Sequence, residues 1–172
     1  ITGCEPRHLD ALWTMLQDTG VRIEKNTSSV TVDATNSSLK AKNVTTHEYP
    51  GFATDLQAPA VVFLTQTEGK SLVHETIFEG RLAWSQDLVR MGARIDMADP
   101  HRVFIQGPTP LRAAQIVCPP ALRPSMIIFL AMLGAPGTSI LRNVYSINRG
   151  YENIAERLNA LGADIERIVD IG

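Results

Sequence analysis

The sequence has 172 residues, of which 44% are hydrophobic and 20% are charged, and its formal net charge is −2 at pH 7. This composition excludes a disordered chain, and the lack of an excess of Lys and Arg disfavours general nucleic-acid binding. The longest apolar run, residues 126–133, is far shorter than the roughly 20 residues that span a bilayer. Two distant cysteines, Cys4 and Cys118, are typical of a reducing compartment, so we expect a cytoplasmic protein.

The first predicted element is an amphipathic helix that begins near Pro6. Its apolar residues Leu9, Leu12, Trp13 and Leu16 recur at the spacing of one helix face. The sequence therefore predicts a helix with one face packed against a core.

The second predicted helix covers residues 55–67 and follows Thr54, which we expect to be its N-cap in a capping box with Gln57. A counterpart is predicted over residues 124–133. Both segments are apolar on most sides, so we expect both helices to be buried. A last helix is predicted from Tyr151, Ile154 and their helical neighbours Leu158 and Leu161.

Short strands are predicted between the helices, at residues 21–24, 30–34, 41–44, 71–75, 103–106, 114–117, 138–142 and 165–169. One pattern occurs three times, at Gly20, Gly92 and Gly162: the end of a helix, then a glycine, then a strand. Glycine is favoured directly after a helix because it adopts positive φ at no steric cost. The alternation predicts an α/β protein of repeated βαβαββ units, with residues 1–172 forming one domain.

Four charged residues occupy repeat-related positions. Asp55 precedes Arg81 by the same interval of 26 residues that separates Arg123 from Arg149. Helix starts favour anions, and guanidinium groups bind phosphate or carboxylate with two hydrogen bonds. These residues therefore form either a site for an anionic ligand, with Asp55 as its one acceptor, or ordinary surface ion pairs.

The other reactive side chains do not form a recognisable site in the sequence. His8, His47, His74 and His101 are scattered without the spacing of metal ligands, so we expect no metal. Cys118 has no nearby histidine or basic cluster, so we expect a buried structural thiol.

Several blocks of sequence resemble the UDP-N-acetylglucosamine 1-carboxyvinyltransferase family of enolpyruvyl transferases. Residues 48–57, Glu-Tyr-Pro-Gly-Phe-Ala-Thr-Asp-Leu-Gln, are similar to the family's substrate loop. The similarity continues in the family's order through residues 75–81, 90–93, 122–123 and 148–152. The resemblance covers essentially the whole chain.

The resemblance implies a fold of two similar domains, each an inside-out α/β barrel of three βαβαββ units with helices inside and sheets outside. It implies that this chain is the C-terminal portion, with about two and a half units of one domain. The missing N-terminal half of such an enzyme carries a mobile loop with a reactive Cys, and a Lys and an Arg that bind phosphoenolpyruvate. The chain alone is therefore expected to be inactive.

The resemblance also implies a reaction and roles for individual residues. The family transfers the enolpyruvyl group of phosphoenolpyruvate to the 3-hydroxyl of UDP-N-acetylglucosamine, the first committed step of peptidoglycan synthesis, without a metal or organic cofactor. Asp55 matches the residue proposed to take the hydroxyl proton, and the backbone of Ile77 matches a position that binds the nucleotide sugar. Arg149 matches a phosphoenolpyruvate ligand, and Arg81 and Arg123 match further arginines of the cleft.

The sequence departs from the family pattern near these residues. Ala121 stands where an Asp is usual, Gly80 where an Asn is usual, and residues 146–148 read Ser-Ile-Asn in place of His-Ile-Asp. Two alternatives therefore stay open: enolpyruvyl transfer to another acceptor such as shikimate 3-phosphate, and a non-catalytic scaffold domain of the same fold.

Overall fold

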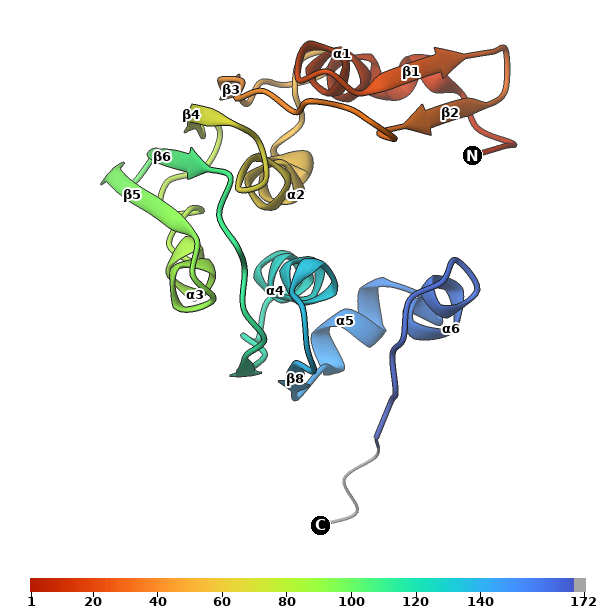
Figure 1. Ribbon diagram of the computed structural model, residues 1–172. Coiled ribbons are helices and arrows are strands. Elements are labelled where there is room, and N and C mark those ends of the chain that lie inside the picture. Colours follow the sequence, from red (N-terminus) through yellow and green to blue (C-terminus); the bar gives the residue numbers. More distant parts are fainter. Residues whose placement is uncertain (169–172) are drawn as a thin grey trace.

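The centre of the molecule is one complete βαβαββ unit (Figure 1). The computed structural model describes residues 1–168. In the central sheet, β3 runs parallel to β4, and β6 pairs antiparallel with both β4 and β5, giving the strand order β3-β4-β6-β5. The elements of this unit are β3 (Val44–Thr45), α2 (Thr54–Leu64), β4 (Gly69–His74), α3 (Ser85–Arg90), β5 (Arg94–Asp99) and β6 (Arg102–Gly107).

Parts of the same unit precede and follow the central one. The antiparallel pair β1-β2 corresponds to β5-β6, and the parallel pair β7-β8 corresponds to β3-β4. The prediction of repeated βαβαββ units is thereby confirmed. These elements are η1 (Pro6–Leu9), α1 (Asp10–Asp18), β1 (Arg22–Lys25), β2 (Val30–Asp33), β7 (Gln115–Val117), α4 (Leu122–Gly134), β8 (Ile140–Arg142), α5 (Tyr145–Gly150) and α6 (Ile154–Asn159).

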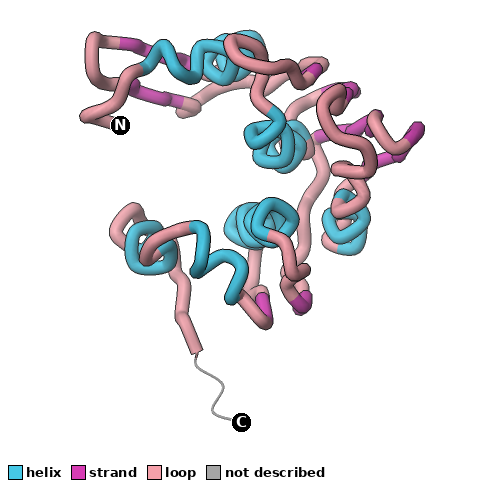
Figure 2. Tube along the Cα trace, turned by 180° about the vertical axis from the view of Figure 1, so that it is seen from behind, coloured by secondary structure: helices cyan, strands magenta, loops and turns pink. Residues whose placement is uncertain are grey.

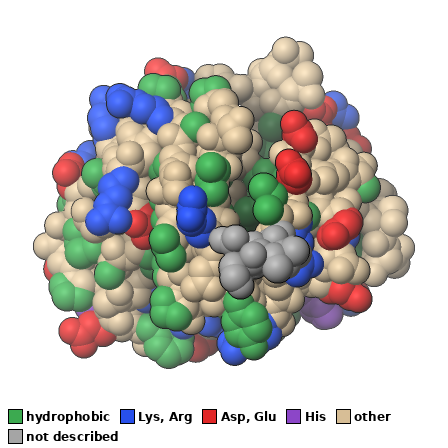
Figure 3. Space-filling view, turned by 90° about the horizontal axis from the view of Figure 1, so that it is seen from below, with side chains coloured by type: hydrophobic (Ala, Val, Ile, Leu, Met, Phe, Trp, Pro, Cys, Tyr) green, Lys and Arg blue, Asp and Glu red, His purple; other side chains and the backbone are tan. Residues whose placement is uncertain are grey.

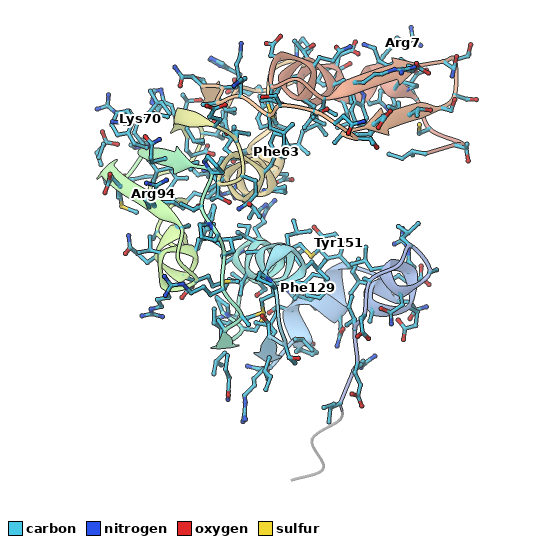
Figure 4. All side chains as sticks on the ribbon, in the orientation of Figure 1. Arg7, Phe63, Lys70, Arg94, Phe129 and Tyr151 are labelled. Carbon is cyan, nitrogen blue, oxygen red and sulfur yellow. The ribbon has the colours of Figure 1, made fainter. Side chains whose placement is uncertain are left out.

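Helices α2 and α4 pack against each other in the interior, and the sheets lie outside them (Figures 1 and 2). Phe63 on α2 and Phe129 on α4 belong to this inner layer, whereas Lys70 and Arg94 lie on the outer sheet (Figure 4). Along α2, whose 11 residues are all described, Asp55 is the one exposed residue. The expected inside-out α/β arrangement with two buried helices is therefore confirmed.

The three glycines of the sequence repeat form three equivalent joints. Gly20, Gly92 and Gly162 have φ values of 101°, 101° and 99°. At each joint the glycine N–H donates to the carbonyl three residues earlier, and the next N–H donates to the carbonyl five residues earlier, at 2.9–3.1 Å. These bonds satisfy carbonyls that a helix end leaves without partners, which is why the pattern recurs.

The predicted last helix is wrong in its continuity. Gly150 ends α5, Tyr151 is extended, and Asn153 adopts a left-handed conformation with φ 45°, so α6 begins only at Ile154. None of the residues of α6, all of them described, is buried, and Leu161 is 84% exposed. The apolar stripe of the predicted last helix thus does not form one buried face.

The predicted strand at residues 165–169 is wrong for its described part. The backbone N–H and C=O of Ile165 pair with the side-chain amide of Asn159 at 2.9 and 2.8 Å instead of with a strand. Val169 lies outside the described residues. The remaining predicted strands form with shifted ends, and the strand expected at residues 41–44 is reduced to Val44–Thr45.

The lower face of the molecule carries apolar side chains at its surface (Figure 3). Exposed apolar residues of the C-terminal elements include Val117, Ile140 and Tyr145. Among the described residues, no helix combines the length and the hydropathy needed to cross a membrane.

Candidate functional site

Asp55 lies at the point where the two buried helices begin. It belongs to the first turn of α2, and Arg123 belongs to the first turn of α4. The Nε–H of Arg123 donates to Oδ1 of Asp55 at 2.5 Å, and Nη1 of Arg81 lies 3.8 Å from the same oxygen. The structure thus brings together three of the four charged residues that the 26-residue spacings singled out.

The two arginines change the acidity of Asp55. The hydrogen bond from Arg123 lowers the pKa of the Asp55 carboxyl, the charges of Arg123 and Arg81 add to this effect, and partial burial opposes it. The same hydrogen bond raises the pKa of Arg123. Asp55 is 62% exposed, so a ligand in solution reaches it. A carboxylate with a lowered pKa is a weak base as long as Arg123 holds it.

Arg81 is held by two contacts besides Asp55. Its Nη1 donates to the hydroxyl oxygen of Thr54 at 2.8 Å, and its guanidinium lies 4.0 Å from the centre of the Phe78 ring. Stacking on an aromatic ring and a hydrogen bond together fix the plane of a guanidinium. The predicted capping box is wrong for this reason: Ala53 is the N-cap, and the Thr54 hydroxyl bonds Glu75 and Arg81 rather than the helix backbone.

Glu75, directly after β4, is the buried centre of a polar network. Its carboxylate is fully buried and accepts hydrogen bonds from the hydroxyls of Thr46 at 3.1 Å and Thr54 at 2.9 Å. The backbone N–H groups of Ile77 and Phe78 donate to it at 2.8 and 3.1 Å. The N–H of Ile77, the predicted backbone ligand of the nucleotide sugar, is therefore already paired within the chain. No pattern in the sequence predicts a role for Glu75 in the site.

A cavity of about 310 Å³ lies between the starts of the two buried helices. Gln57 lies in its lining, and both polar atoms of the Gln57 amide are buried without a hydrogen-bond partner. An unpaired buried amide costs stability, which a polar ligand or an ordered water offsets. The lining residues are Thr54, Gln57, Ala58, Gly80, Arg81, Ala83, Trp84, Ala121, Leu122, Arg123 and Pro124.

Arg149 is the one predicted site residue that stands apart. It is exposed on α5, and its guanidinium lies 5.9 Å from the centre of the Tyr145 ring. Within residues 1–168 it makes no ion pair. The C-terminus of α5 nevertheless lies against the first turn of α4, because a Cβ on Gly150 would come within 2.5 Å of the Leu122 side chain. Tyr151 follows α5 beside α4 (Figure 4).

Cys118 is buried, as expected from the sequence. Burial raises the pKa of its thiol, although a hydrogen bond with Ser125 opposes the shift. A thiol with a raised pKa is a poor nucleophile, because the thiolate is the reactive form.

Comparison with known proteins relates the whole chain to enolpyruvyl transferases. Residues 1–158 match the family described as EPSP synthase (3-phosphoshikimate 1-carboxyvinyltransferase). Proteins of Koribacter versatilis and Acidobacterium capsulatum, both named UDP-N-acetylglucosamine 1-carboxyvinyltransferase, are each 44% identical to this chain over 171 residues. The match covers 99% of this chain and 39% of either relative, so the chain spans about two fifths of their length.

Solved structures agree with the sequence matches. The enolpyruvyl transferase NikO from Streptomyces tendae superimposes with a TM-score of 0.82 at 28% identity, over 92% of this chain and 36% of NikO. An EPSP synthase from Acinetobacter baumannii has a TM-score of 0.63 at 21% identity, which shows a shared fold.

Proposed function

Because the chain belongs to the EPSP synthase (3-phosphoshikimate 1-carboxyvinyltransferase) family, we propose that it forms one side of the active site of an enolpyruvyl transferase. The proposed donor is phosphoenolpyruvate, and the proposed acceptor is the 3-hydroxyl of UDP-N-acetylglucosamine, the substrate named in the relatives. The observation that carries the proposal is the cluster of Asp55, Arg81 and Arg123, whose two arginines line a cavity. We place the reaction in the cytoplasm, at the entry to peptidoglycan synthesis.

The reaction needs a proton acceptor and a site for anions, and the cluster supplies both. The acceptor oxygen forms a bond to C2 of phosphoenolpyruvate while C3 gains a proton. Loss of a proton from C3 and cleavage of the C2–O bond to the phosphate group then release inorganic phosphate and leave the enolpyruvyl ether. In the first step the hydroxyl must lose its proton, and Asp55 is the proposed acceptor of that proton.

Arg123 explains how a carboxylate with a lowered pKa acts as a base. In the structure Arg123 neutralises Asp55. An anionic substrate that binds Arg123 competes with Asp55 for the guanidinium, which returns the Asp55 pKa toward its ordinary value. The base is therefore released when the cleft is filled.

Arg81 and Arg149 are proposed to bind the negative charges of the substrates. Arg81 is fixed beside Asp55, whereas Arg149 is exposed beside the Tyr145 ring, where a ligand in solution reaches it. The backbone of Ile77 is proposed to hold the nucleotide sugar through its carbonyl. The rest of the active site comes, in this proposal, from a second domain, with residues 1–172 belonging to a single domain.

A different acceptor is the second candidate, and two cavity residues favour it. Gly80 and Ala121 both lie in the cavity wall, at positions where the resemblance leads us to expect Asn and Asp. Smaller side chains at both positions leave room for another acceptor.

A chimera tests the proposal. In the Koribacter versatilis relative, the segment that matches this chain over 171 residues is replaced by this chain. We expect the chimera to release phosphate from phosphoenolpyruvate in the presence of UDP-N-acetylglucosamine, while the 172-residue chain alone does not. Activity with shikimate 3-phosphate only, or a folded chimera without activity, would overturn the proposed function. Turnover by the chain alone would overturn the requirement for a second domain.

A further inference from the structure

Glu75 is a charged residue in a place where charge is costly. It is 0% exposed, and within the described part of the chain no basic side chain forms an ion pair with it. Burying a carboxylate without a cation is unfavourable unless hydrogen bonds replace the lost water. Four N–H and O–H donors do so here.

Three of the four donors come from the segments that carry the proposed site, and the fourth, Thr46, follows β3. Thr54 immediately precedes Asp55, and Ile77 and Phe78 lead to Arg81. The backbone of Glu75 is itself anchored, because its N–H donates to the carbonyl of His101 at 2.7 Å and its carbonyl lies 2.9 Å from Nδ1 of the same residue. Glu75 thus links the start of α2 and the loop of Arg81 to the rigid central sheet.

The direction of the hydrogen bonds extends this link to Asp55. The Thr54 hydroxyl donates its proton to Oε2 of Glu75, which leaves its oxygen to accept from Nη1 of Arg81. Arg81 in turn lies 3.8 Å from Asp55. The Glu75 carboxylate can only accept hydrogen bonds, so it fixes the orientation of the Thr54 hydroxyl. This hydroxyl in turn holds Arg81.

We propose that Glu75 is a positioning residue of the enolpyruvyl transfer. Through Thr54 it fixes Arg81 beside Asp55, and through its bond to the Ile77 N–H it fixes the backbone whose carbonyl faces the nucleotide sugar. The inference rests on the proposed function, because it is the reaction at Asp55 that the network serves.

The test uses the active chimera and four variants. Thr54→Val keeps the shape of the side chain and removes the hydroxyl, and Thr54→Ser restores the hydroxyl. Glu75→Gln keeps the size of the side chain but presents N–H groups to neighbours that are themselves donors. Thr67→Val is the matched control: Thr67 is buried, it follows the opposite end of α2, and its hydroxyl donates to the carbonyl of Leu64 at 2.9 Å.

We expect kcat of Thr54→Val and Glu75→Gln to fall by at least about tenfold, the loss that corresponds to one hydrogen bond to a charged group. KM for phosphoenolpyruvate rises less than kcat falls, because Arg149, the other arginine proposed to bind the substrates, is not part of the network. Thr67→Val keeps the parent kcat although it also loses a buried hydrogen bond, and Thr54→Ser returns kcat to within a few-fold of the parent.

Two kinetic results would overturn the inference. One is parent-like kcat in Thr54→Val, and the other is a loss in Thr67→Val as large as that in Thr54→Val at the same melting temperature. Crystal structures of the parent chimera and Thr54→Val give a readout that does not depend on turnover. Arg81 displaced from Asp55 in the variant supports the positioning role, and an unmoved Arg81 contradicts it, even where the chimera lacks the proposed activity.

Discussion

The first turns of α2 and α4 occupy equivalent places in the repeat but are built differently. The α2 turn carries Asp55 and is tied by Thr54 to the buried Glu75. The α4 turn carries Arg123, and its neighbour Leu122 makes apolar contact with the end of α5 at Gly150. One helix start is thus tied to a distant buried carboxylate, whereas the other combines apolar packing with local hydrogen bonds from the Ser125 hydroxyl to the carbonyls of Pro119 and Ala121.

The difference shows how a repeated backbone supports an asymmetric site. The repeat places two helix starts side by side, so residues far apart in the sequence meet. The side chains at the two starts differ in charge: the α2 start carries the acceptor Asp55, and the α4 start carries the cation Arg123, which a ligand can bind.

The largest effect is expected on the α2 side. Asp55→Ala in the active chimera removes the proposed proton acceptor, so kcat should fall by about 10²-fold or more, in the range of general-base contributions. Binding of UDP-N-acetylglucosamine, measured by calorimetry, should weaken far less, because the acceptor acts mainly in the transition state. Near-normal turnover would remove Asp55 from the mechanism.

On α5, whose end packs against the α4 turn, Arg149→Ala should act on substrate binding. Loss of a hydrogen bond to a charged group costs about 1.5–3 kcal/mol, which raises KM for phosphoenolpyruvate by roughly 10- to 150-fold. Steady-state kinetics of the chimera measure this change. Arg90→Ala on α3 is the control, because Arg90 is exposed and pairs with Asp87 at 3.0 Å away from the cluster. Equal effects of the two substitutions would contradict the assignment.

The packing that fixes the α4 turn can be tested without any substrate. Gly150→Ala places a Cβ within 2.5 Å of Leu122, and the overpacking should lower the free energy of unfolding by about 1–3 kcal/mol. Chemical denaturation of the 172-residue chain measures the change. Leu122→Ala in the same chain should recover part of the loss, whereas Gly134→Ala, where a Cβ meets nothing within 4 Å, should cost little.

The smallest effect concerns the ion pair that joins the two turns. Arg123→Met should raise the pKa of Asp55 toward its ordinary value, and Arg81→Met should raise it less, because the Arg123 hydrogen bond is the main cause of the shift. The folded-state pKa is lowered, so the stabilisation is present at neutral pH and is lost as the pH falls through that pKa. Carboxyl NMR titration checks the order, and an unchanged pKa in Arg123→Met would contradict it.

The repeat and the burial of α2 and α4 could be predicted because both are local properties of the sequence. The glycine joints depend on positive φ at one residue, and burial follows from apolar side chains on all sides of a helix. The equal spacings in Asp55–Arg81 and Arg123–Arg149 were informative because they follow the repeat. The structure nevertheless brings only three of the four residues together.

The polar network could not be predicted, because its partners are chosen by tertiary contacts. Thr54 has the sequence of an N-cap, yet its hydroxyl bonds a carboxylate 21 residues away. Glu75 lies in a block that resembles the family, but only its burial and its four donors give it a role. The break before α6 was missed because Asn153 adopts a left-handed backbone that the helical spacing does not indicate.

The glycine joints also bear on how quickly the chain can find its fold. Each joint is closed by hydrogen bonds that reach back three and five residues, so little chain entropy is lost in forming it. The pairing of Gly69 with Gly107 in the central sheet, by contrast, closes a long loop. All three glycine joints end a helix, and those at Gly20 and Gly92 lead directly into the strands β1 and β5, so these turns can form before the strands of the central sheet pair.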